Sequence, residues 1–199
     1  MEQRTDIRLW EAAAGGDAEA FGQIFDRYSE TVYNFCFRRC GSWSQAEDLT
    51  SSVFLQAWMR RGEVHPTSDT LRPWLIGVSI NVLRNWSRTE RRARARLVRA
   101  STRAAAVPDF ADDLVGRLDD ERWAMRVLGV FEHLPRDDQD ILSLAAWGNL
   151  SYEEIGEVLA LPLGTVRSRL SRARRRLTEL AERYGHEGTD STIRKEGTS

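Results

Sequence analysis

Apolar side chains recur with helical spacing along most of this chain, which leaves few folds open to it. Between residues 21 and 36 they occur at intervals of three and four, the pattern of one buried face of an α-helix. The same spacing returns over residues 49–58, 71–86 and 123–145. No segment alternates apolar and polar residues as a half-buried strand would. The sequence therefore predicts an all-α protein.

The character of the sequence changes in the middle of the chain. Residues 99–113 are mostly small or polar and include Pro108, which is typical of a linker between domains. We therefore predict two small helical domains joined by a flexible linker, with the first domain over 8–97, the linker over 98–115 and the second domain over 116–184. Residues 185–199 are nearly free of apolar side chains, so we expect a disordered tail there.

Two observations narrow the class of protein. No apolar run approaches the roughly 18 residues that cross a bilayer, and the N-terminus lacks the apolar stretch of a secretory signal. Cys36 and Cys40 are the only cysteines, which fits a reducing, cytoplasmic location. These thiols lie four residues apart on a helix and could bind a metal or sense oxidants. Buried apolar thiols are the favoured interpretation, so we expect no metal site and no cofactor.

Charge is balanced over the whole chain but unevenly placed along it. The chain has 29 basic and 30 acidic residues, yet residues 84–103 hold eight arginines and one acid. Residues 164–177 hold six arginines and no acid, whereas residues 109–122 hold six acids and two arginines. One basic run is often only a solvated surface. Two separate basic blocks on helical patterns indicate a protein that binds nucleic acid.

A helix-turn-helix pattern lies in the C-terminal domain. Ser151 and Glu154 have the spacing of a capping box, and Pro162 ends the short helix that follows. A second helix begins near Thr165, with apolar residues facing inward and arginines between them. Two short helices of this kind, the second one cationic, are typical of a motif that places its second helix in the major groove of DNA. The alternative is an ordinary arginine-rich surface helix.

The sequence of this motif resembles the DNA-binding end of bacterial extracytoplasmic-function (ECF) sigma factors. The resemblance lies in Leu150–Gly156 and Leu161–Leu177, and the preceding Leu134–Gln139 is similar to the segment that leads into it. Three further segments resemble, in the correct order, the family's domain that binds core polymerase and melts the promoter: Phe21–Tyr33, Ala46–Trp58 and Arg72–Trp86. The resemblance covers about residues 10–183, which is nearly the whole chain.

The resemblance implies a site for core RNA polymerase on the helix that holds residues 46–58. The residues that match are Glu47, Asp48, Leu49, Phe54, Leu55 and Trp58. Acidic residues early in the helix and aromatic residues later can steer a partner by charge and then bury apolar surface. For any one apolar residue of this set, a place in the protein core is an equal alternative. Relatives usually carry a glutamine–glutamate pair where this chain has Thr50-Ser51-Ser52, so the resemblance does not imply that pair's polar contacts for this chain.

The resemblance also implies a site for the minus-ten promoter element, where a base is extruded at a cost of a few kcal/mol into a pocket. The candidates are Trp74, Asn81, Arg84, Asn85, Arg88, Arg91 and Arg92. Trp74 and Trp86 lie on the apolar spacing, so the core is the favoured place for both rings. Asn81, Arg84 and Asn85 lie off that spacing and are the stronger candidates.

The second helix of the motif would read the minus-thirty-five element. Its candidate residues are Thr165, Arg167, Ser168, Arg169, Ser171, Arg172 and Arg174. As a member of this family the protein would bind core RNA polymerase and promoter DNA and initiate transcription. An anti-sigma factor is an expected further partner, and no small-molecule substrate is expected.

Two other classes of protein are alternatives to a sigma factor. An enzyme has little support, because His65, His133 and His186 lie far apart and no phosphate loop, nucleophile elbow or carboxylate cluster stands out. The serious rival is a stand-alone helix-turn-helix regulator that binds operators without polymerase. A sigma factor should bind core polymerase and bind duplex promoter DNA poorly by itself.

Overall fold

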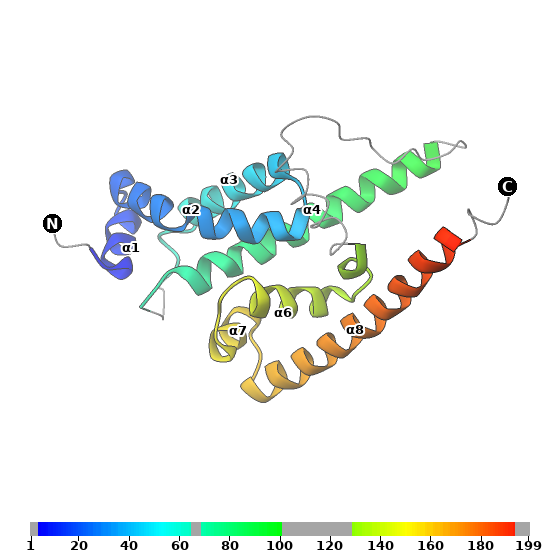
Figure 1. The fold of residues 1–199 in the computed structure, drawn as a ribbon. Coiled ribbons are helices and arrows are strands. Elements are labelled where there is room, and N and C mark those ends of the chain that lie inside the picture. Colours follow the sequence, from blue (N-terminus) through cyan, green and yellow to red (C-terminus); the bar gives the residue numbers. More distant parts are fainter. Residues whose placement is uncertain (1–3, 65–68, 101–128, 194–199) are drawn as a thin grey trace. The chain divides into compact units, whose positions relative to one another are not determined.

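The computed structural model describes residues 4–64, 69–100 and 129–193, with the side chains of 4–64, 69–90 and 129–183 (Figure 1). These residues form helices and turns, with no strand among them, so the all-α prediction is confirmed. The helices are α1 (Asp6–Ala14), α2 (Ala18–Cys40), α3 (Trp43–Met59), α4 (Arg72–Ala100), α6 (Arg136–Ala146), α7 (Tyr152–Leu159) and α8 (Leu163–Ile193). They belong to two compact units, residues 1–122 and 123–199.

The first unit is built around α2, which packs against α1, α3 and α4. Its core takes side chains from all four helices, among them Leu9, Ile24, Val32, Phe35, Val53, Ala57, Leu75 and Ile80. Burying large apolar side chains in this way contributes about 1.5–3 kcal/mol each. The helical spacing of these residues therefore predicts the burial well, because each helix presents one apolar face to the others.

The ends of α2 follow from its flanking residues. The Asp17 carboxylate accepts hydrogen bonds from the backbone N–H groups of Glu19 and Ala20, at 2.9 and 3.0 Å, and so caps the first turn. At the other end Gly41 has φ 69°, and its N–H donates to the carbonyl of Phe37. This left-handed conformation suits glycine, so α2 ends there and α3 can turn back along it.

Phe25 departs from the predicted core of α2. The apolar spacing places it on the buried face, but its side chain is 42% exposed while Ile24 and Tyr28 are buried. Adjacent helix residues point about 100° apart, so Ile24 and Phe25 cannot both face the centre of the same narrow stripe. The Phe25 ring instead meets the Phe54 ring edge-on at the margin of the core, with 4.7 Å between ring centroids.

Cys36 is wholly buried in this unit, and Cys40 is half-buried. Burial, aided by the neighbouring Cys40, raises the pKa of the Cys36 thiol to about 12. Burial also raises the pKa of Cys40. Both thiols are therefore protonated near neutral pH, and Cys36 acts as a small apolar side chain.

The Cys36 thiol should make the stability of the protein depend on alkaline pH. The folded state keeps this proton up to about pH 12, whereas the unfolded state releases it at the ordinary thiol pKa near 8.5. The contribution of this thiol to the stability of the folded state is thus complete below the ordinary thiol pKa. Above that pKa it is lost as pH rises, by about 1.4 kcal/mol per pH unit. Urea unfolding of wild type and Cys36→Ala between pH 8 and 10 checks this. Equal slopes of unfolding free energy against pH in wild type and Cys36→Ala would refute the assignment. Tyr28, whose pKa burial raises to about 12, affects both proteins alike.

The second unit contains α6, α7 and α8, and α8 packs against both of the others. Its core includes Phe131, Leu134, Ile141, Leu144, Ile155, Val166, Leu170 and Ala173. Helix α8 extends to Ile193, into the segment for which the sequence predicts a disordered tail from residue 185. Two single glycines weaken the segment 185–193, but no proline interrupts it, so the helical hydrogen-bond ladder is not blocked. The predicted linker lies mostly within residues 101–128, outside the described residues.

The turn between α7 and α8 stores some backbone strain. Ala160 follows the last residue of α7 with φ 52° and ψ 50°, a left-handed conformation that costs a residue with a Cβ about 1–2 kcal/mol. We expect Ala160→Gly to stabilise the second unit by about 1 kcal/mol and to raise its Tm by several degrees, measured by calorimetry. The control is Ala181→Gly at an exposed position within α8, which should lower the stability instead. A lower Tm for Ala160→Gly would contradict the assigned conformation.

Candidate functional site

The residues predicted on α3 divide into an exposed group and a buried group. Glu47 and Asp48 are exposed, and Leu55 is 59% exposed. Leu49 and Phe54 are only 5% and 4% exposed, so their first contribution is to the core of the unit. Trp58 is half-buried. The outer face of α3 thus offers acidic residues near its start and Leu55 near its end.

An apolar patch surrounds the second half of α3. Met59, one turn beyond Leu55, is 69% exposed, and Phe25 adds exposed ring surface from α2. The Trp58 ring lies against Phe21 of α2, with centroids 5.0 Å apart. We call Phe21, Phe25, Leu55, Trp58 and Met59 the apolar patch. Clustered exposed apolar surface of this kind marks an interaction site.

The apolar patch contains residues that the sequence pattern did not indicate. Met59 lies just beyond the segment that carries the resemblance, and Phe25 was assigned to the core. An apolar residue at the outer edge of a helical stripe could have signalled exposure, but only the packing of α2 on α3 decides it.

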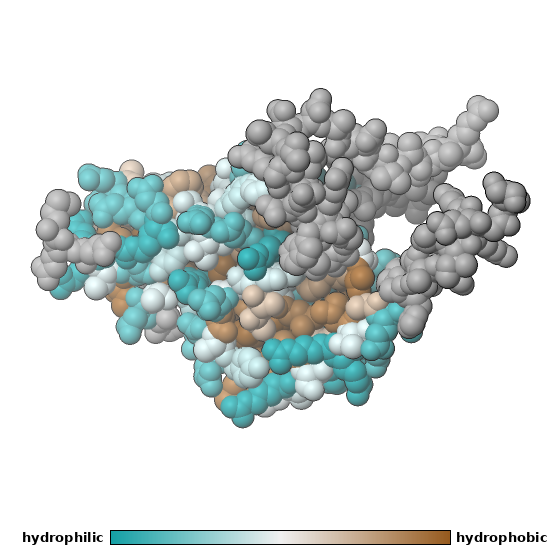
Figure 2. All heavy atoms as spheres, in the orientation of Figure 1, coloured by the Kyte–Doolittle hydropathy of each residue, from teal (hydrophilic) through white to brown (hydrophobic). Residues whose placement is uncertain are grey.

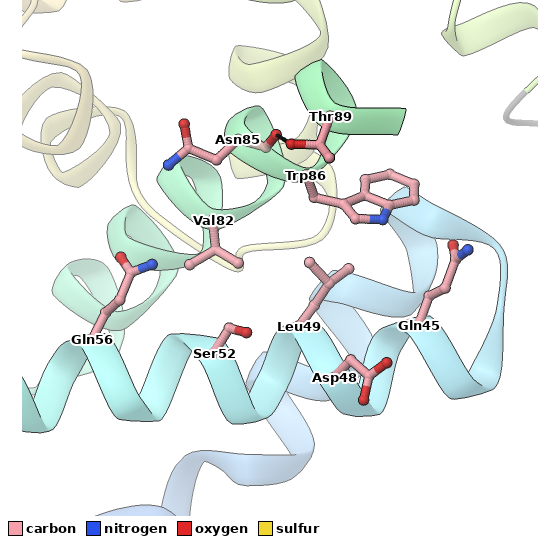
Figure 3. Close-up of a pocket in the computed structure, with 9 residues that line it drawn as sticks. All are labelled: Gln45, Asp48, Leu49, Ser52, Gln56, Val82, Asn85, Trp86 and Thr89. Carbon is pink, nitrogen blue, oxygen red and sulfur yellow. Dashed lines mark hydrogen bonds between the residues drawn. The ribbon is translucent and has the colours of Figure 1, made fainter. Parts of the chain in front are cut away.

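A groove of about 320 Å³ lies between α3 and α4 (Figure 3). It is lined from α3 by Gln45, Asp48, Leu49, Ser52 and Gln56, and from α4 by Val82, Asn85, Trp86 and Thr89. The Thr89 hydroxyl donates to the Asn85 backbone carbonyl at 3.1 Å, and Figure 3 shows Trp86 lying over the Gln45 end of the groove. One groove therefore joins predicted polymerase residues of α3 to predicted DNA residues of α4.

The residues predicted to contact the minus-ten element lie along α4. Asn81, Asn85 and Arg88 are exposed, and Arg84 is half-buried. Trp74 is also half-buried, and its ring meets Trp10 of α1 edge-on at 4.6 Å between centroids. Arg91 and Arg92 belong to α4, but their side chains lie outside the described ones. Asn81, Asn85 and Arg88 are thus accessible to a partner, whereas Trp74 is held by a neighbouring ring.

The first turns of α8 present the residues predicted to contact the minus-thirty-five element. Arg167, Ser168, Ser171, Arg172 and Arg174 are exposed, whereas Thr165 and Arg169 are half-buried. Between them Val166, Leu170 and Ala173 are at most 1% exposed, as the spacing predicts. In Figure 2 hydrophilic side chains cover the coloured part of α8, and apolar side chains lie beside it over α6.

The arginines of α8 differ in their partners. Arg176 donates to Asp138 at 2.5 Å and Arg169 lies 3.6 Å from Asp137, so α6 anchors two of them. Within the described part of the chain, no carboxylate pairs with Arg167, Arg172 or Arg174. An arginine without an internal acid can give its planar fork to a phosphate or to a guanine edge.

The preceding helix α7 has the predicted capping box. The Ser151 N–H donates to the Glu154 carboxylate at 2.6 Å, and the Glu154 N–H donates to the Ser151 hydroxyl at 3.2 Å. Because α7 ends at Leu159 and α8 begins at Leu163, only a three-residue turn joins them. The motif is a helix-turn-helix with α8 as its second helix.

Comparison with known proteins assigns the family. Residues 24–93 match the family model of sigma-70 region 2, and residues 124–177 match that of sigma-70 region 4. The ECF RNA polymerase sigma factor SigK of Mycolicibacterium vanbaalenii is 29% identical over 164 residues, which is 81% of this chain and 82% of SigK. The chain belongs to the ECF RNA polymerase sigma factors.

Two further relatives set the extent of the likeness. This sigma factor is 29% identical to the probable RNA polymerase sigma factor RfaY of Xanthomonas campestris over 177 residues, 86% of the chain but only 43% of RfaY. The sigma factor RpoE of Bartonella quintana, solved in complex with the anti-sigma factor NepR, has a TM-score of 0.53 and 25% identity, covering 81% of this chain and 96% of RpoE.

Two kinds of feature are absent from the described residues. They hold no group of three or more histidine, cysteine or acidic side chains that could bind a metal. No helix among them is both long and apolar enough to cross a membrane.

Proposed function

We propose that this sigma factor binds core RNA polymerase, recognises the minus-ten and minus-thirty-five elements of promoters and initiates transcription from them. The observation that carries the proposal is the presence, in one chain and in family order, of a region 2 unit with an exposed apolar patch and a region 4 helix-turn-helix. We assign polymerase binding, minus-ten recognition and promoter melting to residues 8–97, and minus-thirty-five recognition to residues 116–184. The factor supplies recognition and melting, and the polymerase supplies the chemistry.

The outer face of α3 and the apolar patch would bind core polymerase. Glu47 and Asp48 give charge that steers the encounter, and Leu55, Met59 and Phe25 give apolar surface to bury. Leu49 and Phe54 support the site from within, because they fix α3 on the core.

Helix α4 would bind the minus-ten element. Asn81 and Asn85 are exposed amides that can pair with the edge of an unstacked base, and Arg88 is an exposed cation for the backbone. Arg84, Arg91 and Arg92 extend the proposed basic surface, while Trp74 is assigned to support of the helix start.

Helix α8 would enter the major groove at the minus-thirty-five element. Arg167 and Arg172 lie where base edges or nearby phosphates are in reach, with Thr165, Ser168 and Ser171 between them. Arg174 would contact the backbone, and the pairing of Arg169 and Arg176 with α6 leaves them to orient the helix.

We further propose that an anti-sigma factor regulates the protein in the cytoplasm. RpoE, its structural relative, was solved with such a partner. An exposed apolar patch that serves polymerase is also a surface that a regulator can cover, because binding of the two would then be mutually exclusive.

The rival function is that of a helix-turn-helix regulator acting without polymerase, which the DNA-facing arginines alone would equally support. Measuring the affinity for core polymerase and for duplex promoter DNA separates them. We expect tight binding to core and weak binding to duplex DNA by the isolated protein, with promoter affinity appearing on addition of core. Strong operator-like binding of the isolated protein, together with no binding to core, would favour the regulator.

A further inference from the structure

The side chain of Asp6, at the start of α1, is a buried centre of hydrogen bonds. It is 5% exposed, and its carboxylate accepts from the Arg27 guanidinium and the Tyr28 hydroxyl, both on α2. The same carboxylate accepts from the backbone N–H of Leu71 at 2.9 Å, immediately before α4 begins at Arg72. Asp6 therefore connects three parts of the unit that lie up to 65 residues apart in sequence.

A second hydrogen bond connects α1 to Val64, in the segment that follows α3. The Trp10 indole Nε1–H donates to the Val64 carbonyl at 2.9 Å, and the Trp10 ring also packs edge-on against Trp74 in the first turn of α4. Val64 and Leu71 both lie in the connection between α3, which ends at Met59, and α4. Asp6 and Trp10, about one turn apart on α1, thus hold two points of that connection and the start of α4.

Burying the charged carboxylate of Asp6 costs free energy of folding. A buried carboxylate is tolerated only when it is paired and hydrogen-bonded, and here that of Asp6 accepts from three donors. Helix α1 has only nine residues, too few to be stable alone in water, so its formation depends on this packing. Core apolar residues would hold α1 in place as well, but would not fix the position of the Leu71 amide.

We propose that α1 is a positioning element for minus-ten recognition: Asp6 and Trp10 hold the start of α4, and with it Asn81 and Asn85, in register for promoter DNA. The inference rests on the proposed function of α4. Asp6 and Trp10 touch no DNA themselves. They act through Leu71, Val64 and Trp74.

Two conservative variants separate the bonds from the packing. Asp6→Asn keeps the size of the side chain but loses the charge that binds Arg27 and strengthens the Leu71 bond. Trp10→Phe keeps a ring against Trp74 but removes the donor to Val64. Val32→Ala is the control, because it truncates a wholly buried residue of α2 that makes neither bond.

The first measurement is hydrogen exchange of the free, full-length protein. Exchange over residues 69–76 should rise about ten-fold in Asp6→Asn, the size expected when a hydrogen bond to a charged acceptor is weakened. Trp10→Phe should raise it less, and exchange over 46–57 of α3 should stay unchanged in both. Unchanged exchange over 69–76 in both variants would overturn the proposal, whatever the protein's function.

The second measurement is initiation with core polymerase on a promoter and on its minus-ten variants. Asp6→Asn and Trp10→Phe should reduce the preference for the intact minus-ten element several-fold while leaving the affinity for core unchanged, and Val32→Ala should leave that preference intact. Equal losses of this preference in all three variants would mean that Asp6 only stabilises the fold, and would overturn the positioning role. If the wild type itself does not initiate, the proposed function fails, and the exchange result alone decides whether α1 holds α4.

Discussion

Replacing both Leu55 and Met59 with glutamate should reduce the affinity of this sigma factor for core RNA polymerase by at least about a hundred-fold, since each buried anchor of an interface contributes on the order of 2 kcal/mol. The two side chains are 59% and 69% exposed, so the folded monomer does not depend on them. At an interface, however, each glutamate would be buried without a partner. The loss of the apolar anchors and the burial of unpaired charge both weaken binding to core polymerase.

The measurement is equilibrium binding of labelled core polymerase, with the Tm of each variant as a check on folding. Ile7→Glu is the matched control, because Ile7 is 36% exposed on α1, outside the apolar patch. It should bind core as wild type does. Wild-type affinity of the Leu55→Glu/Met59→Glu protein would place the polymerase site elsewhere on the molecule.

Replacing Arg167 and Arg172 with alanine should abolish recognition of the minus-thirty-five element. Each arginine that reads a base or a phosphate contributes about 1–3 kcal/mol, so the double variant should lose at least about thirty-fold in promoter affinity of the holoenzyme. Neither residue pairs with an acid among the described residues, so their removal breaks no internal ion pair.

The same experiment reports which kind of contact was lost. A phosphate contact removed from α8 lowers the slope of log affinity against log salt by about one, whereas a base contact relaxes sequence preference at one position. Arg38→Ala, which removes an exposed arginine of α2, is the control for loss of a surface arginine elsewhere and should change neither quantity. An unchanged preference for the minus-thirty-five sequence in the Arg167→Ala/Arg172→Ala protein would contradict the assigned orientation of α8.

Much of the second unit could be predicted from sequence because its signals are local. The capping box joins Ser151 to Glu154, three residues away, and the turn is set by Pro162 and its neighbours. The inward spacing of Val166 and Leu170 fixes which arginines of α8 face outward. Short-range hydrogen bonds and helical periodicity need no knowledge of the rest of the chain.

The first unit could be predicted only in outline. Periodicity gives its helices, but whether Phe25 or Met59 is exposed depends on how α2 and α3 cross. The bond from Asp6 to the Leu71 amide spans 65 residues, and its acceptor looks from sequence like an ordinary charged residue near the N-terminus. Long-range partners of this kind come from tertiary packing, which no local pattern records.

The central claim is that this chain gives core RNA polymerase promoter specificity. The most direct test is transcription by core enzyme from DNA upstream of the protein's own coding region, with and without the purified full-length protein. We predict a discrete transcript that requires the protein, starts at one site, and disappears when the minus-ten or the minus-thirty-five element is altered. No protein-dependent transcript from this DNA or from a library of promoter fragments, under conditions where another sigma factor is active with the same core, would contradict the claim.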